Sequence, residues 1–163
     1  PERILNQYSF QMSGGMNQRL VSALGLACGR WVIADEPTKG LDAVIRNQVY
    51  SVLRQIYTEH HCSMLVITHD LAPARRLCDD IRVLYMGRII EQGTAEEIFS
   101  HPVHPYTRSL ISAIPNPNPV VERSRIALHY DYKTSGLDYG AGTMHQIEAH
   151  IVRGTDADLE KWV

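Results

Sequence analysis

WVIADEPT, at residues 31–38, is the stretch of sequence that decides the fold class. Four apolar residues, from Trp31 to Ala34, precede the adjacent carboxylates of Asp35 and Glu36. A short continuous apolar run of this kind is typical of a strand buried on both faces, as in parallel sheets. The pattern therefore predicts a strand that delivers two acidic side chains to its carboxyl end.

The residues that follow predict a helix and a second strand. Asp42 can cap a helix whose apolar stripe runs at helical spacing over residues 45–56. A second apolar run, at residues 64–67, ends at Thr68-His69-Asp70. Strand, helix and strand within about 40 residues form a βαβ unit, which places both strand ends at one edge of a parallel sheet. We therefore expect Glu36 and His69 to be neighbours.

Two polar strand ends at this edge form a candidate site, because ligands of open α/β sheets bind there. Phosphoryl transfer suits the pair of carboxylates. Mg²⁺ takes hard oxygen ligands such as Asp35, and an attacking water needs an acceptor such as Glu36. On its own, however, a strand that ends in Asp-Glu is as often a solvated strand end or a cap for the next helix.

A helix is also predicted upstream, over residues 14–28. Ser13 is a good N-cap, and apolar residues recur at helical spacing until Gly29. The sequence Ser13-Gly14-Gly15 offers bare backbone N–H groups, a hydroxyl and the positive end of a helix dipole, all of which suit a phosphate group. Taken alone, Ser-Gly-Gly is more often a flexible turn.

Downstream of residue 70, the sequence predicts a short helix, a hairpin and two more helices. These elements are expected at residues 71–78, 81–85 with 89–92, 94–100 and 106–114. Thr94, with Glu97 three residues later, indicates a capping box for the helix at 94–100. The alternating prolines of residues 115–119 bar helix and favour an extended linker.

The pattern is weaker beyond the linker. Residues 126–132 and 147–152 alternate in polarity, and a terminal helix is expected from Thr155 or Asp156. We therefore expect a small β-rich appendage over residues 120–163.

Composition bounds the class of protein. The 163 residues suffice for a sizeable core, and 44% hydrophobic residues with a net charge of -2 exclude disordered, collagen-like and strongly nucleic-acid-seeking chains. The apolar runs fall far short of the ~20 residues that span a bilayer. Cys28, Cys62 and Cys78 are widely spaced, which fits buried thiols in a reducing compartment better than disulfides or a zinc site.

Four segments, in this order and spacing, resemble the second half of an ATP-binding-cassette (ABC) ATPase. They are MSGGMNQR at 12–19, the strand that ends in Asp35-Glu36, KGLD at 39–42 and VITHD at 66–70. They match the family's signature loop, Walker B strand, D-loop and switch histidine. Met12 and Met16 replace the commoner Leu and Gln of the signature, a variant usual in one branch. The resemblance implies an α/β fold: the C-terminal half of a P-loop NTPase domain with parallel strands, plus a small β-rich extension.

The resemblance also implies roles for single residues. Ser13, Gly14, Gly15 and Gln18 would close over the γ-phosphate of ATP held by the opposite subunit of a dimer. Asp35 would hold Mg²⁺ through water.

Three further residues complete the implied site. Glu36 would be the general base or would orient the attacking water, and His69 would contact the γ-phosphate. Asp42, in the D-loop, would link the two sites across the dimer.

The C-terminal third resembles one branch of the family. HPVHPYTRSL at residues 101–110, followed by AIP at 113–115, is similar to the extension of ATPases from oligopeptide, dipeptide and nickel importers. The histidines of this run could be metal ligands, but a turn with a capped helix start is the simpler interpretation. His129, His145 and His150 are interpreted as surface or packing residues.

The resemblance implies an ATPase subunit that works on the cytoplasmic face of the cell membrane as a peripheral protein. Its expected partners are a second cassette, identical or paralogous, and membrane permease subunits, with an extracytoplasmic solute-binding protein as an indirect partner and no nucleic acid. Three parts are expected: the end of a helical subdomain at 1–29, the second half of the ATPase core at 30–93, and the extension and tail at 94–163.

A phosphate-binding loop, Gly-x-x-x-x-Gly-Lys-Ser/Thr, does not occur in the sequence. We therefore expect this chain alone to be inactive. Its start within patterned sequence at Pro1 favours part of a full subunit over a split or degenerate module that supplies only the signature and Walker B faces to a partner. An ATPase of DNA repair or chromosome structure is a third interpretation, against which the His-Pro-Tyr run argues.

Overall fold

The computed structural model describes residues 4, 6–27, 31–60, 62–116, 118–131, 133–138 and 140–163. Its contacts divide the chain into two compact units, Pro1–Pro73 and Ala74–Val163. The expected part boundaries at residues 29 and 93 stay predictions. In the described residues, the hairpin that was assigned to the ATPase core shares its unit with the C-terminal extension.

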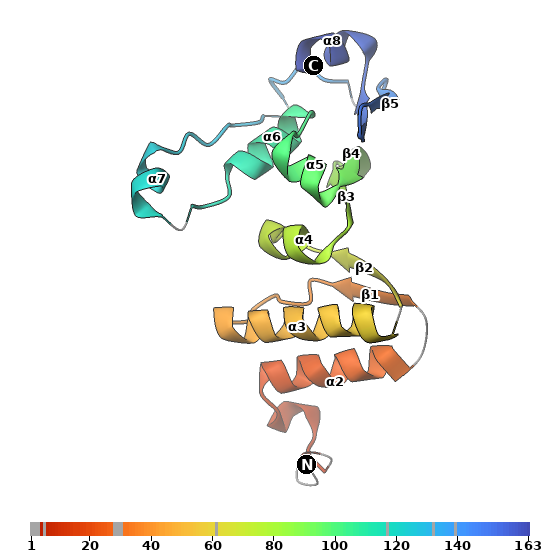
Figure 1. Ribbon diagram of the computed structural model, residues 1–163, viewed down its shortest axis with the longest axis vertical. Coiled ribbons are helices and arrows are strands. Elements are labelled where there is room, and N and C mark those ends of the chain that lie inside the picture. Colours follow the sequence, from red (N-terminus) through yellow and green to blue (C-terminus); the bar gives the residue numbers. More distant parts are fainter. Residues whose placement is uncertain are drawn as a thin grey trace. The chain divides into compact units, whose positions relative to one another are not determined.

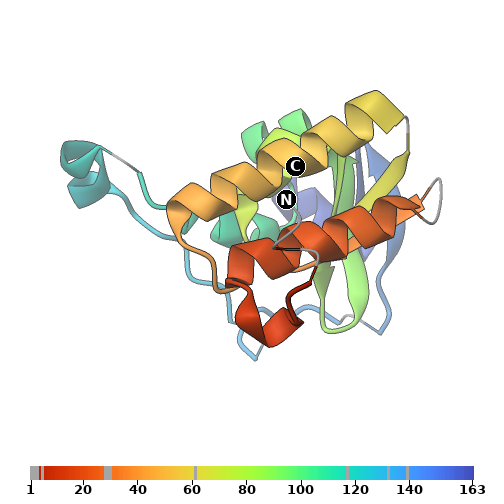
Figure 2. The same ribbon diagram turned by 90° about the horizontal axis from the view of Figure 1, so that it is seen from below.

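The first unit contains a βαβ arrangement. Its elements are the short 3-10 helix η1 (Ser9–Gln11), α2 (Gly14–Ala27), β1 (Trp31–Asp35), α3 (Ala43–His60) and β2 (Ser63–Ile67), and α4 (Leu71–Leu77) follows. The two strands pair in parallel, with Asp35 opposite Ile67. This confirms the predicted strand–helix–strand unit and, over residues 14–27, the predicted helix at 14–28, whose last residue lies outside the described residues. Helices α2 and α3 lie side by side (Figure 1, Figure 2).

Helix α3 contributes most of the buried apolar side chains of the first unit that the structure describes. Asp42 caps it, because its Oδ1 atom accepts from the N–H groups of Val44 and Ile45 at 2.9 and 3.0 Å. The core residues, all less than a tenth exposed, are Val49, Leu53, Ile56 and Cys62. The expected buried thiol is therefore confirmed for Cys62, Cys78 is half-buried, and Cys28 lies outside the described residues.

The strands of this unit are covered on one face only. Trp31, Ile33, Leu65 and Ile67 are exposed, whereas the residues between them are half-buried. The expectation that the first strand is buried on both faces is therefore wrong for the described residues. Side chains alternate between the two faces of a strand, so the exposed residues lie on one face of this two-stranded sheet and the half-buried residues on the other. Helix α3 connects β1 to β2.

The second unit is built on an antiparallel sheet. Its strands are β3 (Asp80–Tyr85), β4 (Arg88–Thr94), β5 (Thr143–Ile147) and β6 (His150–Gly154), in the order β3-β4-β6-β5. Its helices are α5 (Ala95–Ser100), α6 (Pro105–Ser112), α7 (Pro119–Ser124) and α8 (Asp156–Trp162). Met86 and Gly87 turn β3 into β4 with φ angles of 49° and 73°, which suit a tight hairpin turn. The predicted hairpin is confirmed.

The tail at residues 120–163 contains the strands β5 and β6, as its predicted β-rich character requires, and both strands belong to the sheet of the hairpin. Strand β6 pairs with β4, with Gln92 opposite Ile151, and β5 pairs with β6. The predicted terminal helix is confirmed as α8, whose N-cap Thr155 forms a capping box with Asp158. The core of the unit holds Ile90, Ile98, Val103 and Val152.

The expected strand at 126–132 is not formed over residues 126–131, and residue 132 lies outside the described residues. The backbone there bonds to α6: the Ser109 hydroxyl donates to the Leu128 carbonyl at 2.6 Å, and the Leu128 N–H donates to the Ser112 hydroxyl at 2.8 Å. Serine side chains thus take the place of a neighbouring strand.

Two local expectations need correction. The extended linker ends before Pro119, because the Asn118 side chain caps α7 and Pro119 is its first residue, where proline is favourable. The capping box predicted at Thr94 is the second: Thr94 Oγ1 accepts from the Glu97 N–H as expected. The Glu97 carboxylate, however, lies 3.5 Å from His150 Nε2. Among the described helices, none is both long and apolar enough to cross a membrane.

Candidate functional site

The site forms where the two parallel strands of the first unit end. Because Asp35 lies opposite Ile67, the residues just after each strand come together. The Glu36 N–H donates to the Ile67 carbonyl at 2.8 Å, which extends the pairing by one residue beyond β1. Glu36 has a φ of 45°, in the left-handed region that non-glycine residues rarely adopt.

Glu36 and His69 are in direct contact, which confirms that they are neighbours. Glu36 Oε1 accepts from the His69 backbone N–H at 3.1 Å and lies 2.7 Å from His69 Nδ1. A carboxylate can only accept, so Nδ1 carries the hydrogen of this bond. The histidine side chain is 79% exposed and the glutamate side chain 28% exposed. The imidazole therefore presents its remaining edge to solvent.

This contact favours the ionised form of Glu36. The hydrogen bond from the His69 side chain is the main cause that lowers the pKa of Glu36, and the His69 N–H and the Lys39 charge act in the same direction against desolvation. At neutral pH the group is therefore a carboxylate that can accept a hydrogen bond from water.

The turn after Glu36 leads directly into α3. The Lys39 N–H donates to the Glu36 carbonyl at 3.1 Å, and Gly40 has a φ of 74° that the turn requires. Asp42 then caps α3, as described above. The structure thus gives Asp42 a local capping role, and its implied role across a dimer stays a prediction.

Asp35 ends β1 with an exposed side chain. It shares the exposed face of the sheet with Trp31 and Ile33, since side chains alternate along a strand. No cluster of three His, Cys, Asp or Glu side chains that could hold a metal was found in the described part of the chain. A single exposed carboxylate nevertheless fits Mg²⁺, which keeps several waters and takes its other ligands from phosphate oxygens.

The residues predicted to form the signature lie at the start of α2. Ser13 Oγ accepts from the Met16 N–H at 3.3 Å, which confirms the predicted N-cap. Gly14 has open space where a Cβ atom would lie, whereas a Cβ atom on Gly15 would be 3.0 Å from Ile45 Cγ2 of α3. Gly14 can therefore be approached closely, and Gly15 permits the contact between the helices. The side chain of Gln18 lies outside the description.

A polar network beside the site was not predicted. Tyr50 OH lies 3.2 Å from Thr38 Oγ1 and donates to Asp70 Oδ2 at 3.4 Å, and Arg46 NH1 reaches the same Asp70 oxygen at 3.3 Å. Desolvation raises the pKa of Tyr50, so the phenol stays protonated and remains a donor. The signal that could have predicted this network is the spacing of Arg46 and Tyr50, which are four residues apart in α3 and therefore lie on the same face of the helix.

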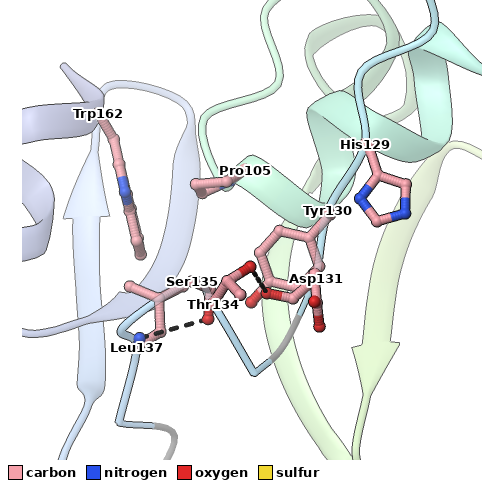
Figure 3. Close-up of a pocket in the computed structure, with 8 residues that line it drawn as sticks. All are labelled: Pro105, His129, Tyr130, Asp131, Thr134, Ser135, Leu137 and Trp162. Atoms are coloured by element: carbon pink, nitrogen blue, oxygen red, sulfur yellow. Dashed lines mark hydrogen bonds between the residues drawn. The ribbon is translucent and has the colours of Figure 1, made fainter.

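A surface cavity of about 260 Å³ lies in the second unit and contains none of the predicted site residues. Figure 3 shows the rings of Trp162 and Tyr130 on opposite sides of it. Its lining residues are Pro105, His129, Tyr130, Asp131, Thr134, Ser135, Leu137 and Trp162. Its lining has one carboxylate and no Lys or Arg, so the cavity lacks the positive charge that phosphate groups require.

The His-Pro-Tyr run forms the capped turn that the sequence favours. His104 Nδ1 accepts from the Tyr106 N–H at 3.1 Å and caps α6, whose first residue is Pro105. His101 is exposed, 3.7 Å from Glu97. His150 is buried, with Nδ1 3.2 Å from Glu91 Oε1, which confirms its interpretation as a packing residue.

Comparisons with known proteins agree with these features. Residues 90–130 match the family described as "Oligopeptide/dipeptide transporter, C-terminal region". The chain is 40% identical over 158 residues to the dipeptide transport ATP-binding protein DppF of Lactococcus lactis, covering 96% of this chain and 50% of that protein. It is 38% identical over 159 residues to the oligopeptide transport ATP-binding protein OppF of Bacillus subtilis, covering 95% of this chain and 52% of that protein.

A solved structure is also similar. It is a dimeric, post-hydrolysis state of the ATP-binding cassette MJ0796 bound to ADP and Pi. It is 30% identical to this chain, with a TM-score of 0.52, and the match covers 58% of this chain and 41% of that one. The chain thus spans about half the length of the curated relatives it matches.

Proposed function

Because the chain belongs to the ABC ATPases, in the branch of oligopeptide and dipeptide transporters, we propose that it forms part of an ATPase subunit that energises uptake of peptides or related solutes. The contact between Glu36 and His69 carries this proposal. It unites an ionised carboxylate and an exposed imidazole at the carboxyl ends of parallel strands, where nucleotide chemistry takes place in α/β folds.

The residues of the site divide the work of ATP hydrolysis. Glu36, held ionised by His69, accepts a hydrogen bond from the attacking water and orients it toward the γ-phosphate. The exposed edge of His69 faces the phosphate, and its Nδ1–H holds the glutamate in place. Asp35 would hold Mg²⁺, which neutralises phosphate charge when bound.

The signature residues act on a second nucleotide. Ser13 and the backbone at Gly14 offer a hydroxyl and N–H groups at the start of a helix of 14 residues, a favourable place for an anion. They would close over ATP held by a second cassette, while Asp42 links the two sites. The complete subunit would also carry the phosphate-binding loop that this sequence lacks, and this chain alone would be inactive.

The remaining partners follow from the family. We propose that the subunit lies on the cytoplasmic face of the cell membrane, bound to permease subunits that receive solute from an extracytoplasmic binding protein. The alternative is a non-hydrolysing module that supplies only the signature and Walker B faces to a partner.

The test is Glu36→Gln in the complete subunit, assembled with its partner cassette. Turnover of ATP should fall about 10²- to 10⁴-fold while ATP binding persists, because the amide cannot accept the proton of the attacking water. Glu59→Gln, the same substitution at an exposed position near the end of α3, is the matched control. Unchanged turnover in Glu36→Gln would contradict the assignment, and an assembled wild-type subunit without turnover would favour the non-hydrolysing module.

A further inference from the structure

We propose that Tyr50 is a positioning residue for the Glu36–His69 pair: its hydroxyl ties the loop after Glu36 to the loop after His69. This inference rests on the proposed ATPase function.

The hydroxyl of Tyr50 stands between the two loops. It lies 3.2 Å from Thr38 Oγ1, two residues after Glu36, and 3.4 Å from Asp70 Oδ2, one residue after His69. Tyr50 has one hydrogen to give and donates it to Asp70, whose carboxylate can only accept, so Thr38 donates to the phenol oxygen. The three groups form one directed chain of hydrogen bonds.

Arg46 braces the same two loops one turn earlier in α3. Its NH1 atom lies 3.3 Å from Asp70 Oδ2, and its NH2 atom donates to the Leu41 carbonyl at 3.4 Å. Arg46 and Tyr50 are four residues apart and therefore project from the same face of the helix. Helix α3 thus acts as a rigid bar to which both loops are attached.

The surroundings favour this role. Thr38 is only 6% exposed, so its hydrogen bond is shielded from water. The Asp70 N–H donates to Thr68 Oγ1 at 3.0 Å, which fixes the second loop locally. The catalytic contact spans two loops that are 33 residues apart in sequence. A displacement of about 1 Å between reacting groups can lower a rate ~10²-fold, so a brace between the loops has a direct effect on turnover.

The test compares Tyr50→Phe with Tyr57→Phe in the complete, assembled subunit. Tyr50→Phe removes the hydroxyl and keeps the ring, whereas Tyr57→Phe removes a hydroxyl from a tyrosine of α3 that is 44% exposed. We expect kcat to fall about tenfold in Tyr50→Phe, with little change in the KM for ATP, and to stay unchanged in Tyr57→Phe. Thr38→Val, which removes the hydroxyl that donates to Tyr50, should cause the same fall in kcat.

A double-mutant cycle with His69→Ala separates positioning from a general structural role. If Tyr50 acts through the pair, Tyr50→Phe should cause little further loss once His69 is removed. Additive losses, or an unchanged kcat in Tyr50→Phe, would overturn the inference. The proposed function has its own test, because Glu36→Gln should lower turnover about 10²- to 10⁴-fold whether or not Tyr50 contributes.

Discussion

At the scale of single residues, His104 combines a capping role with complete burial. Its side chain has no exposed surface, its Nδ1 accepts from the Tyr106 N–H, and its ring packs edge-on against Trp162 with centroids 4.9 Å apart. Burial lowers the pKa of His104 from 6.5 to about 4. The folded protein therefore holds this imidazole in its neutral form over most of the acidic range.

His104 should make the protein sensitive to acid. As the pH falls from 6.5 to about 4, the unfolded chain binds a proton that the folded state excludes, so stability falls on the order of 3 kcal/mol over this window. His104→Asn keeps a good N-cap and cannot titrate, so it should flatten this decline. Urea unfolding at several pH values measures the slope. His101→Asn, at an exposed histidine, should leave the slope unchanged, and an equal slope in His104→Asn would contradict the prediction.

At the scale of elements, the two glycines at the start of α2 differ in what surrounds them. Gly14 has open space at its Cβ position, whereas Gly15 faces the Ile45 side chain of α3 at 3.0 Å. The backbone of Ile45 is held at the start of α3, because its N–H donates to Asp42 Oδ1. The start of α2 is therefore packed against the start of α3 through one glycine and left open at the other.

The pair Gly14→Ala and Gly15→Ala should separate packing from ligand access. Alanine at Gly15 meets Ile45 and overpacks the contact between the helices, so it should be less stable than Gly14→Ala by about 1–3 kcal/mol in denaturant unfolding. Gly14→Ala should unfold like the wild type and lose ATP turnover in the assembled subunit, because the methyl group blocks close approach of a phosphate. Equal stabilities of the two variants would argue against the packing role of Gly15.

At the scale of the molecule, a buried carboxylate organises the second unit. Glu91 has no exposed surface and accepts from the N–H groups of Val103 and His104 at 2.8 and 3.1 Å. The ring of His150 of β6 lies between Glu91 and Glu97, with Nδ1 3.2 Å from Glu91 Oε1 and Nε2 3.5 Å from Glu97 Oε2. A single side chain of β4 thus connects the turn before α6 with the tail of the chain.

Glu91→Gln should weaken the second unit. The amide group can accept from only one of the two backbone N–H groups, and a buried donor without an acceptor costs about 1–3 kcal/mol. Hydrogen exchange of the Val103 and His104 amides should accelerate, and the unfolding midpoint should fall. Glu96→Gln, the same substitution at an exposed position of α5, is the control. Unchanged exchange in Glu91→Gln would show that the carboxylate does not hold the turn.

The parts of the fold that the sequence predicts correctly depend on local signals. Asp42 and Thr155 cap their helices, and the apolar runs at 31–34 and 64–67 become parts of the paired strands β1 and β2. The Glu36–His69 contact was also predictable, since parallel pairing fixes which strand ends meet.

The rest depends on contacts between distant residues. Tyr50 reaches Asp70 across 20 residues, and β6 pairs with β4 across about 60. The segment at 126–131 has the alternation of a strand, but the serines of α6 bind its backbone instead. Nothing in such a local pattern indicates which partner will satisfy the backbone.

The left-handed backbone of Glu36 opposes selection for stability to selection for activity. Glycine and asparagine adopt a φ of 45° at a lower cost than glutamate does. Either would relax the end of β1, yet neither carries the carboxylate that the proposed chemistry uses. Selection for stability alone would therefore favour substitutions at this position that remove the carboxylate. Under the proposed function, a glutamate persists here only while turnover is useful to the cell.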